Sequence, residues 1–305
     1  MHPLAGIYTA AVTPLQADFS PDLEAIPPLL EFFAGRGCHG ILLLGTTGEG
    51  PSFSVEERLG ILRAALKARD LHQPAPAGTF KLLAGTGTPS LTDTIALTHS
   101  AFDLGYDGVV VVPPYYYRKA TDEGLFQYFR EILLKAVPSD GFLLGYHIPG
   151  VAGIGFSEDL LTRLKEAFPR KFAGIKDSSH DADFASRLGN HFGSDLLVLN
   201  GTDSYLKLAL QNHAGGCITA AANLISPELR MIWDAFQRGD ETSALQARVS
   251  EIRHILEQFP PFPPTLKALL ARQFGFPLWP VRPPLEATPS GVVEKLMQDL
   301  ALVSG

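Results

Sequence analysis

Residues 172–179 read Phe-Ala-Gly-Ile-Lys-Asp-Ser-Ser, a short apolar run that ends in a lysine and then turns polar. A segment with helical periodicity follows, from about residue 181 to 190. A short buried strand followed at once by a helix is the repeating unit of parallel α/β proteins. The stretch therefore predicts one strand–helix unit, with Lys176 at the carboxyl end of its strand.

The same unit recurs along the first three quarters of the chain. Continuously apolar runs alternate with amphipathic stretches at intervals of roughly 25 to 35 residues, which favours a parallel sheet covered on both faces. The predicted strands are 7–12, 41–44, 80–84, 108–112, 142–146, 172–176, 196–199 and 216–219. The predicted helices begin at Pro21, near Ser54 and after Ser90, and span 121–135, 157–168, 181–190 and 203–212.

Eight such units predict an α/β fold of the (β/α)8 TIM-barrel type over residues 1–225. A doubly wound open sheet is the alternative, but no Gly-x-Gly-x-x-Gly fingerprint follows the first strand. The pattern then changes to helical stretches without strands at 226–236, 241–259, 264–274 and 290–302, with proline-rich linkers at 260–264 and 280–284. We predict a C-terminal helical extension over 226–305, whose first helix closes the barrel.

Composition narrows the range of partners. The chain has 305 residues, a net charge of -7 and two cysteines, Cys38 and Cys217. The acidic balance argues against nucleic acid or an anionic membrane surface as partner. No CxxC or histidine-rich spacing occurs, so we expect no metal and no cofactor. The start lacks a basic segment followed by an apolar core, and no apolar run approaches the roughly 20 residues that span a bilayer, so we expect a cytoplasmic protein.

Polar side chains gather where predicted strands end, which is where TIM barrels carry their chemistry. After the second strand, residues 45–50 read Gly-Thr-Thr-Gly-Glu-Gly. Three glycines and two hydroxyls can form a nest of donors for a carboxylate or phosphate. An ordinary glycine-rich turn with threonine caps explains the segment equally well. It is no Walker motif, because no Gly-Lys-Ser/Thr follows.

Aromatic residues follow the fourth and fifth strands. Residues 113–118 read Pro-Pro-Tyr-Tyr-Tyr-Arg, and at least one of these hydroxyls must reach water or a partner, such as a neighbouring subunit. Tyr146 ends the fifth strand, where its phenol could carry protons near an amine. His147 alternates with it and is interpreted as a packing residue. Lys176 alone could be a surface lysine, but an amine among apolar groups can attack a carbonyl to form a Schiff base.

Together these motifs resemble the dihydrodipicolinate synthase/N-acetylneuraminate lyase superfamily. The resemblance covers about residues 6 to 225, with five motifs in order, each at a strand end. They are Gly45-Thr46-Thr47-Gly48-Glu49, Pro114-Tyr115-Tyr116, Tyr146-x-x-Pro149, Gly174-x-Lys176-Asp177 and Asn200-Gly201-x-Asp203. The resemblance implies a TIM barrel with a C-terminal helical bundle, usually a homotetramer, and a metal-free class I aldolase or lyase that acts on pyruvate.

The resemblance also implies roles for individual residues. Lys176 matches the Schiff-base lysine, Tyr146 the proton-transfer tyrosine, and Tyr116 the tyrosine that a neighbouring subunit lends across the tight-dimer interface. Thr46 and Thr47 match the pair that holds the pyruvate carboxylate, with Thr47 linked to Tyr146. Two further positions, Gly201 and Ile218, match the pocket lining opposite the lysine.

Departures from the family pattern narrow the expected substrate. Dihydrodipicolinate synthases usually carry an arginine where this chain has Val151, and valine cannot bind the carboxylate of aspartate semialdehyde. After the lysine, Asp177 and the hydroxyls of Ser178 and Ser179 are more typical of relatives acting on hydroxylated keto acids. Residues 202–204, Thr-Asp-Ser, match sialic acid lyases only in part.

We therefore expect an aldolase for a 2-keto-3-deoxy sugar acid or related hydroxylated 2-keto acid, with Ser178 among the substrate-binding residues. The alternatives are a dihydrodipicolinate synthase that grips its carboxylate through Arg118 or Lys119, a hydro-lyase using the same Schiff base, and a keto-acid sensor without catalysis. The small-molecule partners would be pyruvate, or another 2-keto acid, and an aldehyde.

Overall fold

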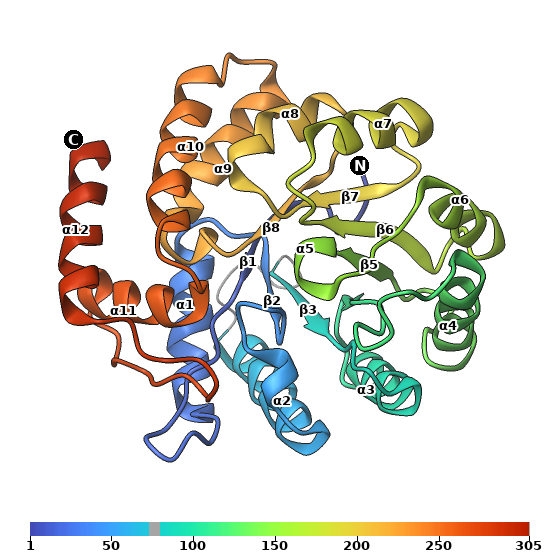
Figure 1. The fold of residues 1–305 in the computed structure, drawn as a ribbon, viewed down its shortest axis with the longest axis horizontal. Helices are drawn as coiled ribbons and strands as arrows, with labels where there is room; N and C mark the ends of the chain where they lie inside the picture. Colours follow the sequence, from blue (N-terminus) through green and yellow to red (C-terminus); the bar gives the residue numbers. More distant parts are fainter. Residues whose placement is uncertain (73–79, 305) are drawn as a thin grey trace.

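The computed structural model describes residues 1–72 and 80–304. At its centre, eight parallel strands form a closed barrel in sequence order, and pairing between β1 and β8 completes the ring (Figure 1). This confirms the TIM-barrel prediction and excludes an open sheet, whose edge strands would lack a partner. The strands are β1 Gly6–Ala10, β2 Gly40–Leu43, β3 Lys81–Gly85, β4 Gly108–Val111, β5 Leu143–His147, β6 Phe172–Asp177, β7 Leu197–Asn200 and β8 Gly216–Thr219.

Helices connect the strands and surround the barrel (Figure 1). They are α1 Ile26–Gly35, α2 Val55–His72, α3 Leu91–Asp103, α4 Asp122–Lys135, α5 Pro149–Ala152, α6 Glu158–Ala167, α7 Ala182–Phe192, α8 Leu206–Gln211 and α9 Ala222–Arg238. Short 3-10 turns occur at η1 Leu23–Ala25, η2 Gly50–Ser52 and η3 Asp203–Tyr205. Thr121 and Ser157 cap α4 and α6 with their hydroxyls.

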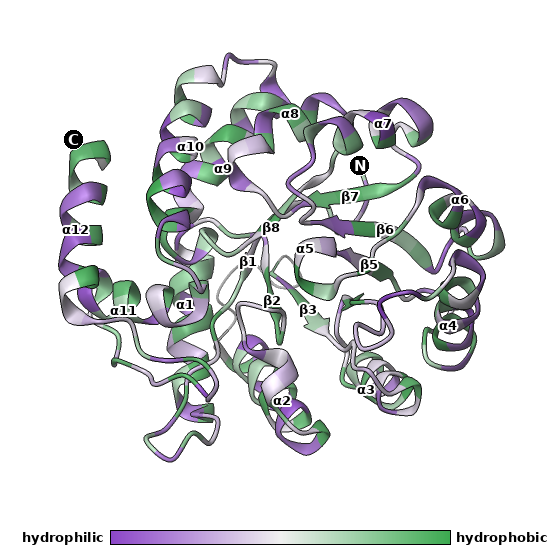
Figure 2. Ribbon diagram, viewed as in Figure 1, coloured by the Kyte–Doolittle hydropathy of each residue, from purple (hydrophilic) through white to green (hydrophobic). Residues whose placement is uncertain are grey.

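The strands separate two apolar layers, because alternate side chains point to opposite faces of the sheet. Figure 2 shows the apolar strands at the centre and the mixed colouring of the surrounding helices. Strand residues that pack inside the barrel include Leu42, Leu83, Val110, Leu144 and Ile218. Their neighbours pack outward against the helices and include Ile41, Leu82, Val109, Leu143 and Cys217.

Two predicted helices differ from the observed elements. The first was expected to begin at Pro21, but α1 begins at Ile26, and the hydroxyl of the preceding Ser20 donates to Asp18. The physical reason is the prolines at 27 and 28, which lack an N–H and are tolerated only in a first helical turn. The helix expected over 203–212 is likewise split into η3 and the shorter α8.

The C-terminal part is helical, as predicted. Helix α9 packs against β1 and β8 and completes the outer layer of helices, and α10 Ser243–Glu257, α11 Phe262–Phe274 and α12 Ser290–Ser304 follow it (Figure 1). The predicted division between residues 225 and 226 falls at a kink inside α9, where Ile225 has non-helical dihedrals. The last residue of the predicted extension, Gly305, lies outside the described residues. Among those described, no helix is long and apolar enough to cross a bilayer.

Candidate active site

Lys176 points into the barrel because of an irregularity in its strand. The pairing of β5 with β6 shifts between Leu143 and Leu144, so that β6 contains one extra residue. Ala173 packs inside the barrel while Ile175 packs outside it. Strict alternation from Ala173 would turn Lys176 toward the helices. The bulge re-aims it, and its side chain is only 3% exposed.

Gly174 makes this bulge possible. A Cβ atom at this position would lie 2.0 Å from the Leu197 carbonyl oxygen of the neighbouring strand. Any side chain would therefore collide with backbone that cannot move without breaking the sheet. The glycine of the Gly-x-Lys motif thus has a direct physical role in aiming the lysine two residues later.

The amine lies against a buried tyrosine. Lys176 and Tyr146 are register partners on β6 and β5, and the Lys176 Nζ lies 4.1 Å from the centre of the Tyr146 ring. Burial raises the pKa of Tyr146, but the charge of Lys176 and hydrogen bonds with Thr46, Lys176 and Ser178 outweigh it, so the pKa lies below its usual value. A phenol tuned in this way is suited to passing protons beside an amine.

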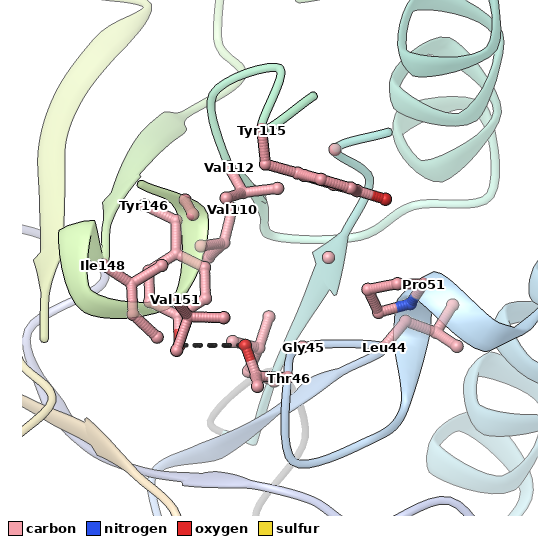
Figure 3. A pocket seen from close by; sticks show the side chains of 14 residues that line it. Leu44, Gly45, Thr46, Pro51, Val110, Val112, Tyr115, Tyr146, Ile148 and Val151 are labelled. Atoms are coloured by element: carbon pink, nitrogen blue, oxygen red, sulfur yellow. Dashed lines mark hydrogen bonds between the residues drawn. The ribbon is translucent and has the colours of Figure 1, made fainter. Parts of the chain in front are cut away.

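The hydrogen bond to Tyr146 corrects one expectation. Thr47 was expected to be its partner, but the structure places Thr46 Oγ1 3.3 Å from the Tyr146 hydroxyl (Figure 3). Thr46 is exposed at the barrel mouth, whereas Thr47 is 7% exposed. Adjacent threonines in a tight turn point in different directions, and the sequence alone does not say which one faces the strand end.

The remaining predicted pocket residues lie at the ends of β6, β7 and β8. Gly201 donates its N–H to the Asp177 carbonyl at 2.6 Å, and a Cβ at Gly201 would lie 1.9 Å from Ser178 Oγ. The glycine therefore leaves the space that the Ser178 hydroxyl occupies. Ile218 is fully buried inside the barrel. The structure thus brings Ser178 and Gly201 together at the same end as Lys176.

The tyrosines of the loop after β4 differ in their exposure to solvent. Tyr115 is half-buried, whereas Tyr116 is 76% exposed and contacts Tyr117 edge-to-face. Within one chain Tyr116 is therefore not part of the site, and a role for it requires a second copy. The packing role predicted for His147 is confirmed, since its Nδ1 accepts the Phe156 N–H and its ring is stacked against Phe184 at 4.6 Å.

A cavity of about 270 Å³ opens beside Tyr146 (Figure 3). Among the described residues that line it, none carries a charge, and the side-chain hydroxyls are those of Thr46, Tyr115 and Tyr146. The rest of the lining is Leu42, Leu44, Gly45, Pro51, Gly85, Gly87, Val110, Val112, Ile148, Val151 and Ala152. Apart from Val151 and the motif glycine Gly45, the sequence did not point to these residues, because they come from separate strands and loops and share no motif.

A second network that the sequence did not predict supports the threonine loop from behind. Glu49, at the end of the loop, accepts from Lys267 Nζ at 2.5 Å and from the Arg282 N–H at 2.9 Å. The Glu49 and Lys267 side chains are 0% and 1% exposed. Lys267 also donates to the Pro280 carbonyl at 2.7 Å. The C-terminal helices thus hold the loop that carries Thr46.

Comparison with known proteins agrees with this geometry. Residues 3–302 match the family model described as the dihydrodipicolinate synthetase family. The chain belongs to the dihydrodipicolinate synthetase family. It is therefore an enzyme of the Schiff-base lyase and aldolase type. Among the described residues, no cluster of three or more His, Cys, Asp or Glu side chains could hold a metal ion.

Individual members of the dihydrodipicolinate synthetase family resemble the chain over nearly its full length. An uncharacterised DapA-like lyase of Chloroflexus aurantiacus is 38% identical over 92% of this chain and 90% of its own. A 4-hydroxy-tetrahydrodipicolinate synthase of Prochlorococcus marinus is 30% identical over 98% and 95%. The crystal structure of DHDPS from Cyanidioschyzon merolae with lysine bound superposes with a TM-score of 0.89, at 26% identity, covering 100% of this chain and 99% of the other.

Proposed function

We propose that this family member makes or breaks a carbon–carbon bond between pyruvate and an aldehyde through a Schiff base on Lys176. The observation that carries the proposal is the buried amine of Lys176 against the ring of Tyr146, whose hydroxyl bonds Thr46. A nucleophile and a proton carrier in direct contact, enclosed by apolar side chains, are the elements that imine chemistry requires.

In the proposed reaction, the neutral amine of Lys176 adds to the C2 carbonyl of a 4-hydroxy-2-keto acid. Tyr146 donates a proton to the departing C2 hydroxyl, so that water leaves and an iminium forms. The C4 hydroxyl then loses its proton to the Tyr146 phenolate, and the C3–C4 bond breaks. Its electron pair moves into the iminium to give an enamine and a free aldehyde. Protonation at C3 and hydrolysis release pyruvate, and the reverse order is the condensation.

The hydroxyl-rich loop supports substrate placement. Thr46 and Thr47 belong to a tight turn in which a Cβ at Gly50 would lie 2.0 Å from the Leu44 carbonyl oxygen. In the proposal this turn holds the pyruvate carboxylate and orients the keto group for attack. Ser178, beside Tyr146, would meet the C4 hydroxyl, and this agrees with the hydroxylated 2-keto acid expected from the sequence.

Trapping the intermediate tests the proposal. Incubation with pyruvate and borohydride, followed by mass spectrometry, should give one reduced adduct on the peptide that contains Lys176. Lys176→Ala should give none, and Lys171→Ala, which removes a lysine at the opposite end of the barrel wall, should leave the adduct in place. An unlabelled Lys176 peptide in the wild-type protein would refute the mechanism. A keto-acid sensor would instead retain most of its pyruvate affinity in Lys176→Ala.

One observation favours a second candidate, 4-hydroxy-tetrahydrodipicolinate synthase. Relatives with that name reach 34% identity, and Arg118 lies against Gly153, two residues after Val151. Arg118 could then provide a carboxylate grip for aspartate semialdehyde. Turnover of aspartate semialdehyde equal to that of the best other aldehyde, abolished in Arg118→Ala, would establish this candidate. A hydro-lyase would be recognised by water loss without aldehyde release.

We also propose that the protein works as a homo-oligomer, with a tetramer as the expected state, in the cytoplasm. The exposed Tyr116 supports this, since a tyrosine that is 76% exposed beside the barrel mouth is available to a neighbouring copy. Light scattering of the purified protein tests the assembly. If Tyr116 completes the site, Tyr116→Phe should lower kcat without changing the mass of the assembly.

A further inference from the structure

The cavity beside Tyr146 identifies the class of the second substrate. We propose that it binds the tail of the aldehyde and that this tail is apolar, either a short branched chain or a single aromatic ring. The inference rests on the proposed function, because it takes Lys176 and Tyr146 as the reacting end. The expected substrate is then not a sugar acid but a 4-hydroxy-2-keto acid whose chain beyond C4 lacks hydroxyl groups.

The position of the cavity supports this assignment. Tyr146 contacts the Lys176 amine and also lines the cavity, and its hydrogen-bond partner Thr46 lines it too. A substrate bound covalently to the lysine therefore extends past Tyr146 when it continues beyond C4. The cavity is the space that the described residues leave there (Figure 3).

The chemistry of the wall determines what can bind. At the entrance, Ile148 and Val151 lie beside the Thr46–Tyr146 hydrogen bond (Figure 3). Val112 and Leu44 extend the apolar surface away from it. A hydroxyl placed against such a surface loses its water without gaining a partner, whereas a methyl group gains from being buried. The wall therefore selects against a polyhydroxylated tail.

Two arginines in the surroundings of the cavity do not change this conclusion. The buried Arg58 lies behind the wall, where its Nη1 donates to the Gly87 carbonyl at 3.2 Å. Arg118 is exposed and lies against Gly153. Neither side chain lines the cavity. A volume of about 270 Å³ is at the small end for ligand pockets, so it suits one ring or a short branched chain.

Two aldehydes of matched shape test the proposal. In 2-methylbutanal, methyl groups stand where glyceraldehyde has hydroxyls. With pyruvate and the wild-type protein, kcat/KM for 2-methylbutanal should exceed that for glyceraldehyde by at least about tenfold. Each buried methyl group should raise kcat/KM about fourfold, and each hydroxyl that is buried without a hydrogen-bond partner should lower it by more than that. Benzaldehyde should also be accepted.

Val151→Arg probes the wall directly. Val151 is 63% exposed, so the variant should fold. It should lower kcat/KM for 2-methylbutanal about fourfold or more and raise it for succinic semialdehyde, which carries a carboxylate. Leu134→Arg is the matched control, since Leu134 is 52% exposed at the far end of α4 and should leave both values unchanged.

The outcomes separate the two proposals. A Lys176 adduct together with equal or better use of glyceraldehyde would overturn the apolar substrate and leave the Schiff-base function intact. An adduct with unchanged selectivity in Val151→Arg would show that the tail binds elsewhere, which also overturns the inference. Failure to form any adduct with pyruvate would remove the proposed function itself.

Discussion

Lys267→Met should destabilise the protein strongly, although Lys267 is far from Lys176 in sequence and is not part of the proposed chemistry. The Lys267 side chain is 1% exposed, and the side chain of its ionic partner Glu49 is fully buried. Burial lowers the pKa of Lys267 despite the neighbouring Glu49. Removing the amine leaves a buried carboxylate without its cation, a change that typically costs about 3–5 kcal/mol.

That cost translates into a measurable shift in melting temperature. With an unfolding entropy of about 2.1 cal/mol/K per residue, a loss of 3–5 kcal/mol lowers Tm by about 5–8 °C for a chain of this length. Glu49 also belongs to the loop that carries Thr46, so kcat/KM with pyruvate should fall about tenfold as the loop shifts. Calorimetry and steady-state kinetics measure the two effects.

Two further variants decide whether the buried charge is the cause. Lys295→Met breaks an exposed pair with Asp299, whose side chains are 56% and 28% exposed, and should change stability by less than about 0.5 kcal/mol. Glu49→Gln combined with Lys267→Met removes both charges and should recover part of the loss. If Lys267→Met melts within 1 °C of the wild type, roughly 0.6 kcal/mol, the reasoning is wrong.

Three other predictions follow from the site and its supports. Gly174→Ala should lose at least about 3 kcal/mol of stability or fail to fold, because the new methyl group would collide with the Leu197 carbonyl. Gly60→Ala is the control: its methyl group meets nothing within 4 Å, so this variant should be neutral or stabilising. Thermal melts of both variants check this. Tyr146→Phe should keep its fold but lower kcat by about 10²–10⁴, measured as the rate of aldehyde release, and a change under threefold would remove Tyr146 from proton transfer. Burial lowers the pKa of His147 from 6.5 to about 4. Between pH 6.5 and 4 the unfolded chain therefore binds more protons than the folded protein, so the free energy of unfolding decreases as the pH falls through this range. His147→Gln should flatten this fall in a Tm–pH series, and an identical slope would contradict it.

The sequence was a good guide to the barrel because each strand is a short, continuously apolar run followed by a helix. That local signal does not depend on what the strand packs against. The helix starts were less certain. Prolines at 27 and 28 move the start of α1 to Ile26, a local effect that could have been read from the sequence.

The residues of the candidate site also differ in how well the sequence predicts their positions. Lys176 and Tyr146 could be placed together because both end neighbouring strands of a parallel barrel, where register brings equivalent positions side by side. Which threonine meets Tyr146 depends on the dihedrals of a tight turn, and there the prediction named Thr47 where the structure has Thr46. A motif records which residue types are present but not which way they face.

The bulge in β6 shows why counting alternate residues is not enough to predict where the side chain of Lys176 points. By strict alternation from Ala173, Lys176 would face the helices, and the expectation of an inward amine would fail. The extra residue reverses the parity, and it can exist only because Gly174 lets the strand approach Leu197 closely. The glycine and the lysine are therefore one functional unit, in which the first residue has no chemistry and the second has no correct orientation without it. A variant in which β6 lacks this extra residue should still carry Lys176, but its amine should face the helices and form no adduct with pyruvate.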